Sequence, residues 1–262
     1  MKLWALITIT TLLLITAQPG AAQSTQLRVL ASNGMKAVID DLRPRLEKEL
    51  GRPLAIEFNT STAIRQRIEA GEAFDVAVLT KEVLTDLGKA GKIASGSVVD
   101  LGRSGIGFGV RSGASKPDIA TPEAVKKTLL NTKSMTWVTA GASRVHIDRM
   151  VESLGIVSEV NPKTVLTNAV DESVERVADG KTEMIITLTS EILPAKGVQY
   201  VGPLPAKFQN YVAFAAGVGP KSAAPAAAAL FIKSLVGPGA AKIYESKGME
   251  LPGSSATRAP VK

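Results

Sequence analysis

The chain has no cysteine and a single histidine among its 262 residues. Without cysteine it has neither disulfides nor thiolate ligands, so its stability must come from an apolar core. The shortage of both residue types argues against a transition-metal site, and we expect no metal and no cofactor. Aromatic residues make up 4% of the chain, too few for a surface that stacks single-stranded nucleic acid.

Positive charge exceeds negative charge, but the cationic residues are scattered. The 31 lysines and arginines outnumber the 24 aspartates and glutamates, which gives a net charge of +7 at pH 7. Because these cations form no cluster and no nucleic-acid-binding motif is present, we expect no nucleic-acid partner. A diffuse positive surface favours small anions instead.

The first 22 residues have the three parts of a secretory signal peptide. Met1-Lys2 is positively charged, residues 3–17 are almost entirely apolar, and residues 20–22 are small. The apolar run is shorter than the ~20 residues that span a bilayer, which argues against a membrane anchor. No cysteine follows for a lipid anchor. We therefore expect export to the periplasm with cleavage of the signal peptide.

Short apolar strands alternate with helical patterns, which is typical of an α/β fold with a parallel sheet. Pro44 lies inside the first helical pattern, so we expect a kink or an early break there. In the first half, strands are predicted at 27–31, 54–58 and 74–79. In the second half, strands are predicted at 135–138, 183–188 and 212–216, with helices at 147–154, 170–178, 221–236 and 238–247.

A glycine-interrupted strand at residues 105–111 lies between the two halves. It contains G-x-G, but no helix of the dinucleotide-binding pattern follows. We interpret it as a crossing between two α/β lobes, with residues 212–216 as the second crossing strand. The predicted division is residues 23–105 with 212–262 for lobe 1, and residues 106–211 for lobe 2.

Hydroxyl side chains follow two of the predicted strands. Ser32 follows the strand at 27–31, and Thr60, Ser61 and Thr62 follow the strand at 54–58. Parallel strands end at one edge of a sheet, and helices that begin there present free N–H groups to anions. Each hydroxyl is also explained as an ordinary helix N-cap. Two such loops at one edge favour an anion-binding site.

Several short motifs occur in the order and spacing of a known family. Leu30-Ala31-Ser32 stands where that family has Ala-Ala-Ser, and Thr60-Ser61-Thr62 stands where it has Gly-Ser-Ser. Residues 69–76 are similar to its Gln-x-Gly-Ala-Pro-Ala-Asp-Val. From residue 27 to 251 the chain resembles the periplasmic molybdate-binding proteins of ABC importers, within the bacterial extracellular solute-binding class.

The resemblance implies a fold, a ligand and a partner. The fold is that of type II-like periplasmic binding proteins, a hinged clamp of two α/β lobes. The ligand is a tetrahedral oxyanion, molybdate or tungstate first, held without a cation. The partner is the membrane permease of an ABC importer, and the receptor is a monomer. In the first lobe, Ser32 and Ser61 would supply hydroxyls, with Thr60 and Thr62 beside them.

The second-lobe positions depart from the family pattern. Ser143 and Val170 stand at backbone N–H donors, but Leu188 stands where the family has a ligand-binding tyrosine. Arg144 and His146 lie in a loop that reads Pro-Ala-Gly-Arg-Tyr in the family. Each of the two is also explained as a solvated or structural residue. Because a guanidinium binds carboxylates in bidentate fashion, a small di- or tricarboxylate is the alternative ligand.

Catalytic motifs are absent from the sequence. It contains neither G-x-S-x-G nor H-E-x-x-H, and His146 lies only three residues from Ser143 on one loop. We therefore expect a binding protein and not an enzyme, with an exported hydrolase as the less favoured reading. An adhesin or signalling receptor with the same fold stays open.

Overall fold

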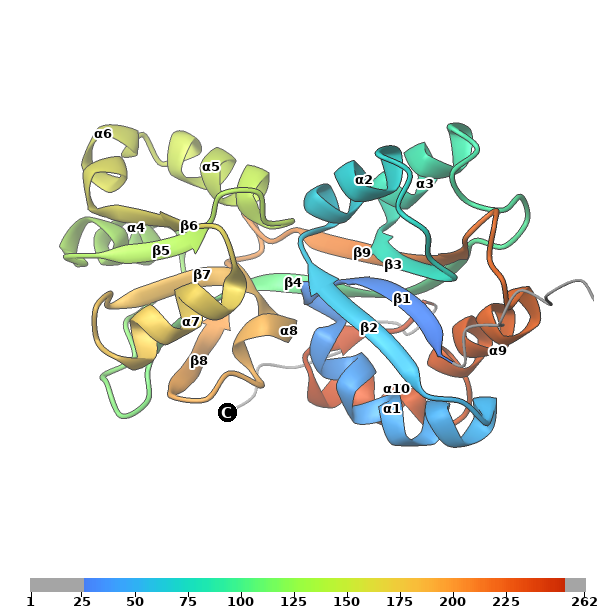
Figure 1. Ribbon diagram of the computed structural model, residues 1–262. Coiled ribbons are helices and arrows are strands. Elements are labelled where there is room, and N and C mark those ends of the chain that lie inside the picture. The colour runs from blue at the N-terminus through green and yellow to red at the C-terminus, as the bar shows by residue number, and fades with distance from the viewer. Residues whose placement is uncertain (1–25, 253–262) are drawn as a thin grey trace, which may run out of the picture.

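The computed structural model describes residues 26–252, which form two α/β lobes side by side (Figure 1). This arrangement confirms the predicted two-lobed α/β fold. The predicted signal peptide, residues 1–22, lies outside the described residues.

The first lobe is built on a sheet with the strand order β2-β1-β3-β9-β4. The strands β1, β2 and β3 are parallel, and β9 is antiparallel to β3 and β4. Its strands are β1 (Leu27–Ser32), β2 (Leu54–Asn59), β3 (Val76–Thr80), part of β4 (Val99–Arg111), β9 (Tyr211–Val218) and β10 (Met249–Glu250). Its helices are η1 (Asn33–Met35), α1 (Lys36–Leu50), α2 (Ser61–Glu69), α3 (Lys81–Lys89), α9 (Pro225–Leu235) and α10 (Ala240–Ser246).

The second lobe continues the same run of strands in the order β4-β7-β5-β6, and β8 also pairs with β4. Its strands are β5 (Met135–Val138), β6 (Thr164–Thr167), β7 (Met184–Leu188) and β8 (Val198–Pro203). Its helices are α4 (Pro122–Asn131), α5 (Arg144–Ser153), α6 (Val157–Val160), η2 (Asn161–Lys163), α7 (Val170–Ala178) and α8 (Thr189–Ile192).

Strand β4 crosses from one lobe to the other through the middle of the molecule (Figure 1). Residues 99–105 pair with β9, whereas the segment from Ile106 onward pairs with β7 and β8. The crossing inferred from the glycine-rich sequence is therefore confirmed. The return crossing differs in kind: residues 204–210 are not a strand, and β9 pairs only within the first lobe.

The glycines of β4 are explained by close packing on both sides of the strand. A Cβ atom added at Gly107 would lie 2.6 Å from the Tyr200 ring and 2.8 Å from the carbonyl oxygen of Gly202. One added at Gly109 would lie 2.9 Å from Ile185, Ile192 and Val198. Any larger residue would therefore push the neighbouring strands and helices away from the crossing.

Helix α1 runs through Pro44 without a break, which corrects the expectation of an early end. Proline lacks the N–H that would bond the carbonyl of Asp40. Both residues are exposed, so water can satisfy that carbonyl, while Leu42 and Leu46 are buried and anchor the helix. The helix ends at Gly51, whose φ of 61° is left-handed, as expected for a glycine cap.

Helices α9 and α10 close the first lobe. Pro225 is the first residue of α9, and the side chains of Phe231 and Tyr244 are buried in the main apolar core. Among residues 26–252, no single helix is long and apolar enough to cross a membrane. The α9 and α10 helices meet that criterion only as a pair bent by 63°.

The packing at β4 predicts the effect of one methyl group. Gly107→Ala forces the new Cβ against a backbone carbonyl, so we expect a loss of about 1–3 kcal/mol in the free energy of unfolding. The matched control is Gly88→Ala in α3, where an added Cβ meets nothing within 4 Å. Urea unfolding of both variants tests this, and equal stabilities would contradict it.

Candidate functional site

A cavity of about 640 Å³ lies between the two lobes. Its first-lobe lining comes from η1, α1 and the end of α10: Asn33, Lys36, Ala37, Asp40, Asp41 and Lys247. Its second-lobe lining comes from α7, α8 and the residues after α8: Val170, Asp171, Val174, Ser190, Glu191, Pro194, Ala195 and Lys196.

Of the predicted site positions, Val170 lines this cavity, whereas Ser32 and Leu188 do not. The residue after Ser32, Asn33, and the second residue after Leu188, Ser190, are in the lining. The arrangement follows from topology, because β1 and β7 end here and α7 begins here. The arrowheads of β2 and β5 also point toward the space between the lobes (Figure 1).

Ser32 is buried but unengaged. It is 3% exposed, and its hydroxyl does not cap the η1 turn that follows. Within residues 26–252 this hydroxyl makes no hydrogen bond, so both its proton and its lone pairs are available. The hydroxyl oxygen is not among the fully buried unpartnered atoms of the described chain, so a ligand or water can reach it.

The hydroxyls at the start of α2 have three different roles. The Oγ1 atom of Thr60 accepts the N–H of Ala63 at 3.2 Å, so the N-cap explanation holds for this residue. The Oγ atom of Ser61 accepts the N–H of Thr80 at 3.0 Å, which leaves its own proton free to donate. Thr62 is exposed. None of the three hydroxyl residues lines the cavity.

Thr80 is a hydroxyl residue at this sheet edge that the sequence analysis missed. It ends β3, stands at the N-cap of α3, and makes no side-chain capping bond. Its backbone N–H is tied to Ser61, so the ends of β2 and β3 are joined at this edge. The signal was present in the sequence, because a threonine follows the apolar run at 74–79 as Ser32 follows the first strand.

The loop before α5 contains Ser143 and Arg144. Ser143 is 4% exposed, and its carbonyl accepts the N–H of Ile147 at 3.1 Å. The Nε atom of Arg144 donates to both carboxylate oxygens of Asp148, at 2.8 and 2.7 Å. The terminal nitrogens of Arg144 make no hydrogen bond within the described chain. Neither Ser143 nor Arg144 lines the cavity.

His146 connects α5 to the segment before β9. Its Nδ1 atom lies 2.9 Å from the amide nitrogen of Asn210, which can only donate, so the ring proton is on Nε2. Burial, and then the positive charge of Arg149, lower the pKa of His146, while Glu82 of the first lobe opposes the shift. The neutral ring therefore has a structural contact that explains its position.

Leu188 fills space between the lobes without offering a donor. It is 1% exposed, and a Cβ atom added at Gly34 would lie 2.9 Å from its Cδ1 atom and 2.5 Å from the Phe214 ring. Next to it, the hydroxyl of Ser190 donates to the carbonyl of Gly34 at 2.9 Å. The N–H of Ser190 donates to the hydroxyl of Ser104 at 3.1 Å. Helix α8 thus fastens the second lobe to η1 of the first.

Glu191 lines the cavity and was not predicted from the sequence. Its Oε2 atom accepts the hydroxyl of Thr187, and its carboxyl group also accepts the N–H of Leu188. Burial raises the pKa of Glu191 to about 7, with a contribution from the charge of Asp171, although the two hydrogen bonds lower it. The group is therefore present in both protonation states near neutral pH.

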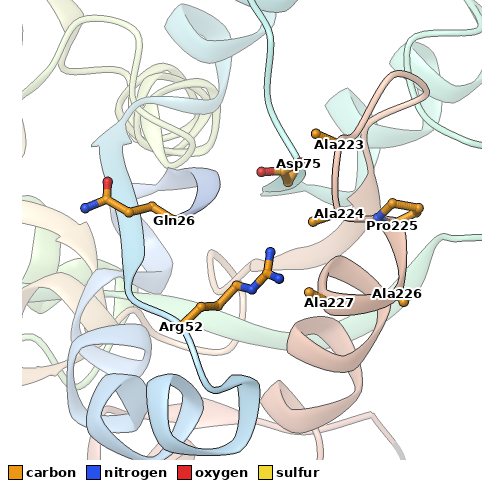
Figure 2. A pocket seen from close by; sticks show the side chains of 8 residues that line it. All are labelled: Gln26, Arg52, Asp75, Ala223, Ala224, Pro225, Ala226 and Ala227. Carbon is orange, nitrogen blue, oxygen red and sulfur yellow. The ribbon is translucent and has the colours of Figure 1, made fainter. Parts of the chain in front are cut away.

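A second cavity, of about 260 Å³, lies at the opposite edge of the first-lobe sheet (Figure 2). Arg52, Asp75 and the alanines at the start of α9 line it. The carboxylate of Asp75 accepts the N–H of Arg28 at 2.8 Å and the hydroxyl of Ser222 at 2.6 Å. This carboxylate therefore joins β1 to the segment before α9, and no predicted site residue lies here.

Metal-binding geometry is not found in the part of the chain that the structure describes. Residues 26–252 contain no group of three or more His, Asp or Glu side chains placed to hold a metal ion.

Comparison with known proteins gives one family and several fold relatives. The model of the bacterial extracellular solute-binding protein family matches residues 27–250. The aconitate isomerase of a Pseudomonas species is 32% identical over 244 residues, which cover 90% of each chain.

Two solved structures illustrate the likeness in fold. The periplasmic molybdate-binding protein of Azotobacter vinelandii has a TM-score of 0.74 and 18% identity, covering 86% of this chain and 99% of its own. The sulfate-binding protein of Mycobacterium tuberculosis has a TM-score of 0.69 and 17% identity, covering 88% of each chain. These similarities concern the two-lobed fold and do not select a ligand.

The different roles of Ser32 and Ser61 predict different stability effects. Ser61→Ala leaves the Thr80 N–H without its acceptor and is expected to cost about 1 kcal/mol of unfolding free energy. Ser32→Ala removes no hydrogen bond of the described chain, so we expect a change under about 0.5 kcal/mol. Denaturant unfolding without ligand measures both, and equal losses would show that Ser32 has a structural partner.

Proposed function

Because this chain is a bacterial extracellular solute-binding protein, we propose that it is the periplasmic receptor of an ABC importer for a small di- or tricarboxylate. The observation that carries the choice of ligand is the 32% identity to an aconitate isomerase, over 90% of both chains. Aconitate is a small tricarboxylate. By contrast, identities of 18% and 17% to the molybdate- and sulfate-binding proteins leave the oxyanion unsupported beyond the fold.

The interlobe cavity supports an organic anion by its size and its donors. Its volume of about 640 Å³ falls within the range of roughly 300–1,000 Å³ that is common for small-molecule sites. The first turn of α7, which begins at Val170, offers backbone N–H groups, and its N-cap Ala169 has no side chain to satisfy them. Lys36, Lys196 and Lys247 add positive charge to the lining. Asp40 and Asp41 offset two of these charges through ion pairs, and Asp171 and Glu191 are further acids of the wall.

The proposed receptor closes like a clamp. In this proposal the described parts of the two predicted lobes, residues 26–105 with 212–252 and residues 106–211, are the two halves of the clamp. In the proposal, the first lobe contributes the hydroxyls of Ser32, Thr60, Ser61 and Thr62. The second lobe contributes Ser143, Arg144 and the backbone of Val170, with Leu188 as an apolar wall. Closure would bring the terminal nitrogens of Arg144 to a ligand carboxylate.

Molybdate or tungstate is the second candidate ligand, and one observation favours it. Ser32 has an unengaged hydroxyl beside a helix N-terminus, which is the kind of donor that holds an oxyanion without a cation. Against it, Leu188 supplies no hydroxyl where the family resemblance implies a tyrosine. Family membership favours binding without turnover. Because the relative that is 32% identical is an isomerase, turnover of aconitate should be tested as well.

A thermal-shift panel on purified residues 23–262 separates the two ligand classes. The panel contains citrate, aconitate, molybdate, tungstate, sulfate and phosphate. A ligand at 100 times its Kd stabilises a protein by roughly 2.7 kcal/mol, which raises Tm by several degrees at this chain length. We expect the shift with aconitate or citrate. A shift with molybdate and tungstate alone would replace the carboxylate proposal by the oxyanion reading.

Removing one guanidinium tests the role of Arg144. If it binds a ligand carboxylate, Arg144→Ala should weaken carboxylate binding by roughly 2 kcal/mol or more, measured by calorimetry. The control is Arg149→Ala, an exposed arginine of the same helix. An unchanged carboxylate affinity in Arg144→Ala would remove this residue from the site while leaving the cavity and the other donors as proposed.

A further inference from the structure

Glu191 occupies a position that ligand binding alone does not explain. It lines the interlobe cavity together with Lys36 of the first lobe and with Val170 at the N-terminus of α7. A carboxylate placed against an anionic ligand opposes binding, so its presence in the cavity wall calls for another role. Among the acids of this wall, Asp40 and Asp41 form ion pairs with lysines, whereas Asp171 and Glu191 form none within residues 26–252. Of these two, Glu191 is held in place by the Thr187 hydroxyl.

We propose that Glu191 is the acid–base group of an isomerisation in this cavity, transferring a proton between two carbon atoms of a bound unsaturated tricarboxylate. This inference rests on the proposed carboxylate-binding function. It adds to that function a reaction and the residue that performs it.

The proton transfer is balanced without a cofactor. A carboxylate oxygen of Glu191 takes a proton from the methylene carbon that lies between a carboxylate and the double bond. The electron pair of the broken C–H bond becomes the new double bond to the neighbouring carbon. The former double-bond pair then takes a proton from the Glu191 carboxyl group at the far carbon, after that group has been able to exchange its proton with solvent. The double bond has moved by one carbon, and nothing is oxidised or reduced.

The surroundings of Glu191 suit both halves of this transfer. Burial brings the pKa of Glu191 to about 7, and a general acid–base group works best when its pKa is near the working pH. The Thr187 hydroxyl and the Leu188 N–H hold the carboxyl group in place. A carboxylate can accept about four hydrogen bonds, so acceptor capacity remains for the substrate proton.

The same cavity can stabilise the negative charge that develops on the substrate. When the proton leaves carbon, charge spreads over the double-bond system and its carboxylates. The first turn of α7, which no side chain caps, and Lys36, which is paired with Asp40, belong to the lining of the same cavity as Glu191. Fixed donors of this kind act where charge develops in the transition state.

A structural explanation of Glu191 must be separated from the catalytic one. Glu191 is the third residue of α8, and a glutamate there often bonds back to the N-cap N–H, as it does to Leu188. Glu191→Gln keeps an oxygen for that capping bond but cannot carry the proton. The matched control is Glu152→Gln, the same change at an exposed position of α5.

Exchange in D2O is the decisive measurement. The protein is incubated with aconitate, and proton NMR follows the replacement of carbon-bound hydrogen and the conversion between isomers. We expect exchange and conversion with the wild-type protein and with Glu152→Gln. With Glu191→Gln, both rates should be at least about 100-fold lower. Calorimetry should show that Glu191→Gln still binds aconitate.

Binding and exchange together distinguish failure of the isomerisation from failure of the receptor function. Aconitate binding without exchange by the wild-type protein would overturn the isomerisation and leave the receptor proposal standing. No binding of any carboxylate would overturn both proposals. Unchanged exchange in Glu191→Gln would assign the proton transfer to another group.

The pH profile of the wild-type protein gives a test that does not depend on a variant's folding. The groups around the cavity are Lys36, Asp40, Asp41, Asp171, Lys196 and Lys247. Because the reaction needs the basic form of Glu191, kcat/KM for isomer conversion should rise with pH and level off above about 7. A kcat/KM that is constant between about pH 6 and 8 would overturn the assignment.

Discussion

The hydrogen-bonded ladder along β4 is the constraint on which both lobes depend. From Val99 to Gly105 the strand pairs with β9, and from Ile106 onward with β7 and β8, so one backbone belongs to the sheets of both lobes. Each sheet takes its direction from this strand, and the cavity forms where the two sheets turn their ligand-side edges toward one another. Glycine at 107 and 109 is the condition for this arrangement, because side chains of both flanking layers approach the strand.

Helix α8 both contacts the first lobe and contains Glu191, which lines the cavity. Ser190 bonds both Gly34 of η1 and Ser104 of β4, and Leu188 packs beside Gly34, so the helix bears on the first lobe while β7 holds it in the second. The next residue is Glu191, in the cavity wall. Any motion of the lobes that changes the α8–η1 contact therefore also moves the Glu191 carboxyl group relative to the first-lobe lining of the cavity.

The electrostatics of the cavity are mixed and not simply cationic. Lysines of the first lobe are paired with aspartates of α1, and the second lobe presents both an α7 N-terminus and the acids Asp171 and Glu191. A tetrahedral oxyanion needs only convergent donors. Under the proposed isomerisation, the Glu191 carboxyl group, with a pKa of about 7, serves a ligand whose own protons are moved.

The sequence alone determined the α/β class, the crossing near residue 105 and the polar strand ends, because these depend on local patterns of apolar, glycine and hydroxyl residues. The hydroxyl of Ser32 was singled out in this way, whereas Val170 came from the family resemblance, and both stay predictions as site residues. The roles of Ser61 and Arg144 were decided by tertiary and helical contacts, with Thr80 and Asp148 respectively. Helix α1 tolerates Pro44 because the carbonyl of Asp40, which loses its N–H donor, belongs to a residue exposed to water.

Only the tertiary structure revealed Glu191 and the cavity it lines. The bond between Ser190 and Gly34 joins residues 156 positions apart, and no local pattern encodes such a separation. A glutamate early in a short helix is ordinary in sequence. It becomes distinctive only when folding buries it against a second lobe and raises its pKa.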